Sequence, residues 1–183
     1  MVMLIVGAMV ETLVKHMTQK YLDNLDGVKV GGAPSWYMEP VKDQMCVFTH
    51  QKGSFGAIDI AKDNARFKMK KRIDDVIEVV IYKTQGEIKD KKEKEVVDSF
   101  RKDPNLPSFI KTNLKFTQVT YADEVKTAFV RACIPKNTIL DYQKDRLMKI
   151  NTAVLSTKSK GAFDSLDAEF GDDKSNGDDK FDF

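Results

Sequence analysis

Residues 58–80 constrain the fold more than any other part of the chain. Apolar side chains recur there at intervals of three and four residues, which is the spacing of one face of an α-helix. These positions are Ile58, Ala61, Ala65, Met69, Ile73, Val76, Ile77 and Val80. Small alanines fill the first half of this face and larger side chains the second. We therefore predict a long amphipathic helix whose beginning lies close against a sheet.

Three short segments have the composition of β-strands. Residues 45–49 are an apolar run of strand type, and residues 114–121 and 125–134 are two further candidates. The polar residues 122–124 between the last two suit the connection of a β-hairpin. The sequence therefore predicts three strands, of which the second and third are consecutive along the chain.

Two more helices are expected around these strands. A short amphipathic helix is predicted near Val96 and Phe100, and Pro104 and Pro107 are expected to end it. Asn137 is a candidate cap for a helix that runs through about Val154. The order of elements predicts an α+β fold of two layers. In this fold a three-stranded antiparallel sheet is packed by the long helix, with flanking N- and C-terminal helices.

The sequence divides into four parts. We predict an N-terminal helix over residues 1–26, a linker over 27–34, an α+β domain over 35–155 and an acidic disordered tail over 156–183. The apolar pattern of the first part starts at the first residue and continues to Leu25. Its wholly apolar stretch is too short to span a bilayer, which takes about 20 residues. We expect a secretory signal, a helix that docks on a protein or membrane surface, or a plain N-terminal helix.

Charge is distributed unevenly along the chain. Residues 164–183 carry a net charge of −6, so the rest carries +8 and the whole chain +2. On the long helix, a possible basic contact face opposite the apolar stripe consists of Lys62, Arg66, Lys70 and Arg72. Such a surface can meet anionic lipid, nucleic acid or an acidic protein. Interspersed aspartates and the lack of an aromatic row favour a solvated helix face over a nucleic-acid site.

The sequence contains little that suits catalysis or metal binding. His16 and His50 are its two histidines, and neither has further ligands at helical spacing. We therefore predict no catalytic, cofactor-binding or metal-binding residues, and no cofactor. Cys46 and Cys133 do not form a C-x-x-C pair. Two buried thiols are favoured over a disulfide, because the sequence does not show whether the two residues come within bonding distance.

The segment that ends the linker resembles a known family. Residues 32–37, Gly-Ala-Pro-Ser-Trp-Tyr, are similar to the Gly-x-Pro-x-Trp start of the LPP-twenty family of small bacterial envelope lipoproteins. A strand, a glycine-containing turn and an alanine-rich helix with an Asn-Ala-Arg step follow as in that family. The likeness covers roughly residues 32–150. The positions that carry the family motif are Gly32, Pro34, Trp36, Ala61 and Ala65.

The resemblance implies an exported protein of the periplasm or outer membrane that has no catalytic activity. Some members of the family build disks around the bacterial flagellar motor, and others are surface antigens. No lipobox cysteine follows the apolar start, so the lipid attachment that the resemblance implies would require a natural N-terminus that lies upstream or has been removed. Trp36 is a candidate binding aromatic, although a plug over one end of the core is the favoured interpretation.

Two functional hypotheses follow. The first is a non-enzymatic structural or assembly protein of the cell envelope, such as a component of a periplasmic or outer-membrane assembly of the flagellar-disk type. It would act as a homo-oligomer through strand edges, and its residues 1–25 would contact another subunit or the membrane surface. The alternative is a nucleic-acid-binding module that uses the basic helix face from Lys62 to Arg72. The alternative is the less favoured of the two, so nucleic acid is not the expected partner.

Overall fold

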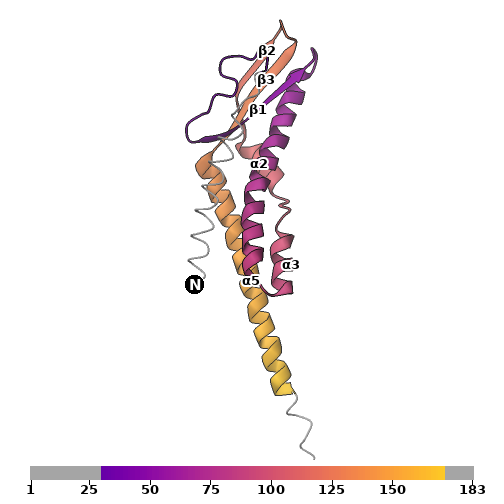
Figure 1. The fold of residues 1–183 in the computed structure, drawn as a ribbon, viewed down its shortest axis with the longest axis vertical. Helices are drawn as coiled ribbons and strands as arrows, with labels where there is room; N and C mark the ends of the chain where they lie inside the picture. The colour runs from indigo at the N-terminus through magenta and orange to yellow at the C-terminus, as the bar shows by residue number, and fades with distance from the viewer. Residues whose placement is uncertain (1–29, 172–183) are drawn as a thin grey trace, which may run out of the picture.

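The structure of this protein, a computed structural model, describes residues 30–171. The helix predicted over 1–26 and the start of the predicted linker lie outside the described residues. Figure 1 shows a sheet at one end of an elongated molecule and helices that run away from it. The elements are, in order, β1 (Gln44–Lys52), α2 (Ala57–Glu87), α3 (Lys91–Ser99), α4 (Leu106–Asn113), β2 (Lys115–Ala122), β3 (Thr127–Pro135) and α5 (Lys136–Gly171).

The three strands form one antiparallel sheet in the order β1-β3-β2. The last strand along the chain is therefore the central one. Side chains alternate between its two faces, as strand geometry requires. Met45 and Val47 of β1 and Val130 of β3 belong to the main core, whereas Cys46 belongs to a second cluster on the outer face. The predicted α+β fold with a three-stranded antiparallel sheet is confirmed.

The long helix α2 begins close to the predicted position and packs against β1 and β3. Gly56 precedes it with a φ of 76°, a left-handed conformation that glycine adopts without steric cost. Ala57, Ala61 and Ala65 are buried at its start, so the helix approaches the sheet closely there, as predicted. In the loop before it, Phe55 is fully exposed. The second half of α2 continues past the strands and contacts α3 and α4.

A helix that the sequence did not predict, α4, lies between α3 and β2. Pro104 and Pro107 were expected only to end the preceding helix. Instead, Pro107 occupies the first turn of α4, where a missing N–H leaves no helical hydrogen bond unmade. Leu106 and Ile110 of α4 are buried in the main core. The connection between α3 and β2 is therefore a packed part of the domain.

The C-terminal helix α5 is much longer than predicted. The sequence predicts a helix to about Val154 and a disordered tail over 156–183, but α5 continues to Gly171. The prediction of disorder is therefore wrong for residues 156–171, while residues 172–183 lie outside the described part. Ile139, Leu147 and Ile150 of its first half are buried in the main core. The second half extends beyond the ends of α2 and α3 (Figure 1).

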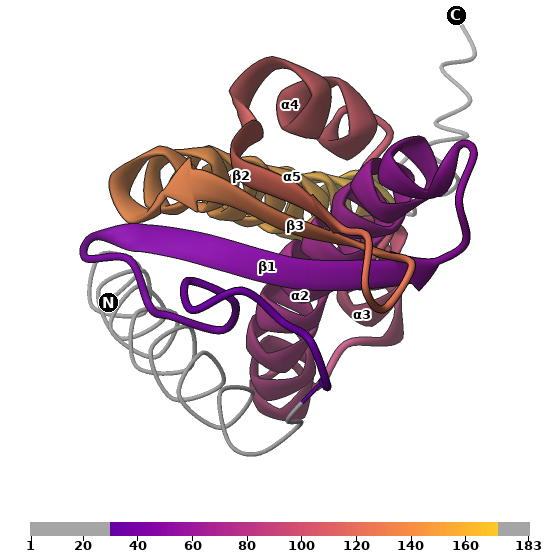
Figure 2. The same cartoon turned by 90° about the horizontal axis from the view of Figure 1, so that it is seen from above.

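The segment over residues 30–43 covers the outer face of the sheet. Figure 2 shows it running alongside β1 before it turns into that strand. Tyr37, Met38 and Val41 pack against the outer-face cluster of Cys46, Phe48 and Cys133. This cover protects from water the face of the sheet that α2 does not touch.

Candidate functional site

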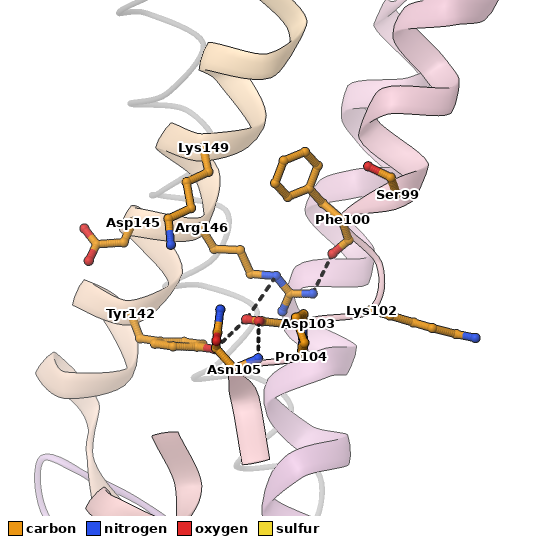
Figure 3. A pocket seen from close by; sticks show the side chains of 10 residues that line it. All are labelled: Ser99, Phe100, Lys102, Asp103, Pro104, Asn105, Tyr142, Asp145, Arg146 and Lys149. Carbon is orange, nitrogen blue, oxygen red and sulfur yellow. Dashed lines mark hydrogen bonds and ion pairs between the residues drawn. The ribbon is translucent and has the colours of Figure 1, made fainter. Parts of the chain in front are cut away.

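A cavity of about 430 Å³ lies between α5 and the loop that joins α3 to α4. Figure 3 shows the side chains that line it. They carry charges of both signs, with Lys102, Asp103, Asp145, Arg146 and Lys149 among them. The charged side chain that lies deepest in this wall is Arg146, which is only 5% exposed. Its contacts decide what the cavity can do.

Arg146 joins α5 to two other parts of the chain. Its Nη2 donates hydrogen bonds to the carbonyls of Phe100, at 2.7 Å, and Arg101, at 3.1 Å. Its Nε lies 3.7 Å from the carboxylate of Asp103, and its Nη1 lies 3.7 Å from that of Asp74 on α2. Figure 3 shows the guanidinium directed toward the loop rather than toward solvent. A buried cation is tolerated when carboxylates and carbonyls surround it in this way.

Tyr142 completes this arrangement one helical turn before Arg146. Its hydroxyl donates to the carboxylate of Asp103, and its ring stacks on Phe109 with centroids 4.0 Å apart. Burial, together with the Asp103 carboxylate, raises the pKa of Tyr142 well above its usual range. The proton therefore stays on the hydroxyl at physiological pH. We call Arg146, Tyr142, Asp103 and Asp74 the Arg146 cluster. Its contacts hold α5 to α2 and to the loop between α3 and α4, which is a structural role.

The sequence did not single out the Arg146 cluster. Tyr142 and Arg146 are four residues apart and so share a helix face, which is the one local signal available. Their partner Asp103 lies in a loop about 40 residues earlier, and Asp74 lies earlier still. No pattern of spacing connects positions so far apart in the chain.

Cys46 and Cys133 form a disulfide between β1 and β3. The two residues are opposite each other in the strand register, and their Cα atoms are 4.1 Å apart. The prediction of two buried thiols is therefore wrong. Strand pairing brings together residues that are 87 positions apart, and the sequence pattern does not reveal which strands are neighbours.

Tyr37 lies at the centre of an aromatic cluster on the same outer face. Its ring meets that of Phe129 edge-on at 5.0 Å between centroids, and its hydroxyl is hydrogen-bonded to Nδ1 of His50 at 3.0 Å. Burial raises the pKa of Tyr37 to about 12, so the hydroxyl stays protonated at physiological pH. Trp36 lies edge-on against Tyr37 and 5.7 Å from the guanidinium of Arg131. These contacts favour the interpretation of Trp36 as a plug.

The other motif positions also lie around the sheet. Ala61 and Ala65 are buried beneath its inner face, where the backbone carbonyl of Ala61 accepts a hydrogen bond of 2.7 Å from the hydroxyl of Thr49. Gly32 and Pro34 belong to the covering segment on the outer face. The structure thus places the five motif positions on both sides of one sheet and does not bring them together into a site.

Gly32 is the motif position with the strictest backbone requirement. Its φ is 74°, and a Cβ there would lie 2.6 Å from Cγ1 of Val125 in the β2–β3 hairpin. We expect Gly32→Ala to lower the free energy of unfolding by about 1–2 kcal/mol, because an alanine would be strained and would clash. Gly31→Ala is a matched control, since a Cβ there meets nothing within 4 Å. Urea denaturation of both variants checks this, and equal midpoints would contradict it.

The predicted basic face is largely occupied by contacts within the chain. Lys62 and Arg66 lie over the ring of Phe116, at 5.7 Å and 5.1 Å from its centroid. Lys70 forms an ion pair of 2.8 Å with Asp74, one turn further along α2. In these contacts the cationic side chains lie along α2 itself and over the neighbouring strand β2. They leave less positive charge for a ligand than the sequence alone indicates.

Two further cations of α2 cover the outer edge of the sheet. Nη1 of Arg72 donates to the carbonyl of Cys46 at 2.7 Å, and Nζ of Lys68 donates to the carbonyl of Phe48 at 3.0 Å. Burial, and secondarily the charge of Arg72, lowers the pKa of Lys68. Because β1 is an outer strand, these carbonyls would otherwise be available to another strand. This basic face therefore has a structural role at the β1 edge.

Comparisons with known proteins add no relative. No protein-family model, curated protein or solved structure matches the chain. Within residues 30–171, no group of three His, Cys, Asp or Glu side chains is placed to hold a metal ion. Over the same range, no helix combines the length and the apolar character needed to cross a bilayer.

Proposed function

We propose that this protein is a non-enzymatic structural or assembly component of the bacterial cell envelope, located in the periplasm or at the outer membrane. The observation that carries the proposal is the Cys46–Cys133 disulfide. Disulfides form and persist in the periplasm and outside the cell but are rare in the cytosol. Both sulfur-bearing residues are almost fully buried, as in a bond that holds a fold together.

The resemblance to the LPP-twenty family supports the same proposal. Its strand, glycine turn and alanine-rich helix correspond to β1, the loop before α2, and α2 itself. Gly32 lies against the β2–β3 hairpin, Trp36 packs over the outer face of the sheet, and Ala61 and Ala65 lie under its inner face. The motif positions therefore serve the fold, which is the expected role in a family without catalytic activity. A flagellar-disk-like assembly of identical subunits is the setting that the resemblance suggests.

The proposal is tested by the thiol state and the location of the protein in its own cells. Thiols are blocked with a maleimide at the moment of lysis, and fractions are then separated and probed with an antibody. We expect the protein in the envelope fraction, with its two cysteines modified only after reduction. A cytosolic protein with both thiols modified at once would overturn the proposal. A cytosolic enzyme with known free cysteines, measured in the same lysate, controls for oxidation during handling.

The alternative of a nucleic-acid-binding module has weaker support. Lys62, Arg66, Lys70 and Arg72 each contact a partner within the chain. Binding to phosphates would have to compete with these contacts. A titration with single-stranded and double-stranded DNA at low salt distinguishes the two hypotheses. Tight binding that weakens steeply with salt would favour the alternative.

A further inference from the structure

The part of α5 from Ser159 to Ser165 is not covered by any other described element. Lys158 forms an ion pair with Glu93 at the start of α3, at 3.6 Å. Beyond this contact, every side chain from Ser159 to Ser165 is exposed. Figure 1 shows this part of the helix extending alone past the other elements. A helix of this length normally depends on packing for most of its stability.

Three exposed apolar side chains lie on one face of this helix. Met148 is 53% exposed, Leu155 44% and Phe163 67%. They recur at seven and eight residues, so they lie along one line of the helix, with Thr152 and Ser159 between them. In the sequence, the same spacing continues to positions 166 and 170, which are leucine and phenylalanine. We call Met148, Thr152, Leu155, Ser159 and Phe163 the α5 stripe.

The sequence of α5 makes an uncovered helix unfavourable here. Gly161 lies in its interior, where glycine costs about 1 kcal/mol relative to alanine. The last turn contains no basic residue, although the helix dipole favours cations at that end. Acidic residues stand in its last two turns instead: Asp164, Asp167 and Glu169. A partner that supplied both apolar surface and positive charge would remove these penalties.

The charges along α5 indicate what the partner is. Residues 136–158 of α5 are basic on balance, with five lysines and arginines against two aspartates. Residues 159–171 are acidic on balance, with Asp164, Asp167 and Glu169 against Lys160. A second copy of α5 in the opposite direction would place its basic part beside the acidic part of the first, and the reverse. Two copies in the same direction would place like charges together.

We propose that α5 pairs antiparallel with α5 of a second copy of this chain along the α5 stripe. With the two-fold axis at Ser159, the position of Leu155 is opposite that of Phe163, and position 148 is opposite position 170. Apolar positions of the two stripes then face each other, and the basic half of each helix lies beside the acidic half of the other. This inference rests on the proposed assembly function and specifies the surface through which two subunits associate.

The mass of the full chain in solution tests the pairing. At micromolar concentration, light scattering after gel filtration should give a mass of at least twice 20.8 kDa. The double variant Leu155→Lys with Phe163→Lys should raise the dissociation constant of the dimer by about 100-fold or more. The two chains of a dimer would together place four lysine charges in the apolar contact. Its circular dichroism should stay unchanged, since both side chains are exposed in the single chain. Phe67→Lys on α2, which is 70% exposed, is the matched control and should leave the mass unchanged.

The direction of pairing is tested with single cysteines and a short bismaleimide. Ser159→Cys should cross-link two chains, whereas Thr152→Cys should not, because the axis separates the two copies of position 152. Efficient cross-linking through Thr152→Cys would show parallel helices and overturn the proposal. A wild-type chain that is monomeric at 100 µM would overturn it as well. In that case, a lower melting temperature of the stripe variant would indicate that the N-terminal segment covers the α5 stripe. Loss of binding to anionic vesicles by the same variant would indicate that the stripe lies on a membrane.

These results are independent of those that test the proposed function. A monomeric chain found oxidised in the envelope would remove the α5 pairing and leave the envelope assignment standing. A paired chain found reduced in the cytosol would do the opposite.

Discussion

Replacing Cys46 and Cys133 together by alanine is expected to lower the free energy of unfolding by about 4 kcal/mol. The bond closes a loop between residues 87 positions apart, and cross-linking so long a loop removes much of the entropy of the unfolded chain. Alanine avoids burying the hydroxyl groups that serine would bring to this apolar cluster. Guanidinium denaturation of the oxidised protein and of the variant measures the difference.

A reducing agent provides the control for this experiment. Reduction should destabilise the wild-type protein by a similar amount and leave the double alanine variant unaffected. If reduced and oxidised wild-type protein unfolded at the same denaturant concentration, the bond would have no stabilising role. In that case the strand pairing of β1 with β3 would depend on packing and hydrogen bonds alone.

Arg146→Ala is expected to lower the free energy of unfolding by about 3–5 kcal/mol. The change leaves the carboxylates of Asp103 and Asp74 without their shared cation and removes two hydrogen bonds to the loop after α3. That loop would lose its attachment to α5. Thermal and chemical denaturation of the full chain measure the loss.

Two further variants separate charge from packing in this experiment. Lys149→Ala changes an exposed neighbour on the same cavity wall and should alter stability by less than about 0.5 kcal/mol. Arg146→Met keeps much of the side-chain volume but not the charge. We therefore expect it to lower the free energy of unfolding nearly as much as Arg146→Ala does. A methionine variant as stable as the wild type would mean that the Arg146 cluster contributes only packing.

The long helix and the strands were predictable because their signals are local. The stripe from Ile58 onward repeats every three to four residues, and the structure buries Ala61, Met69, Ile73 and Ile77 along one side of α2. The hairpin of β2 and β3 joins strands that are adjacent in the sequence. Periodicity and turn composition are sufficient for elements of this kind.

Two local signals were misleading. Pro107 was interpreted as the end of a helix, yet proline is equally suited to the first turn of one, and α4 begins there. The region after Ser156 is rich in serine, glycine and charged residues, which is typical of a disordered tail. The structure instead continues α5 to Gly171. Composition alone does not distinguish a disordered tail from an exposed helix.

Contacts between distant parts of the chain could not be predicted. The disulfide depends on β1 lying next to β3, a pairing between the first and last strands. The Arg146 cluster depends on α5, α2 and a loop meeting at one point. A single sequence carries no record of which residues approach each other in space.

The covalent link between β1 and β3 also affects what a single proteolytic cut can do. Any one break of the backbone between Cys46 and Cys133 leaves both fragments attached through sulfur. Phe55, fully exposed in the loop before α2, is an accessible point for such a cut. A nicked molecule would run as one band without a reducing agent and as two with it. If the protein lies in the periplasm or at the outer membrane, as proposed, this bond would hold the cut domain together where proteases are abundant.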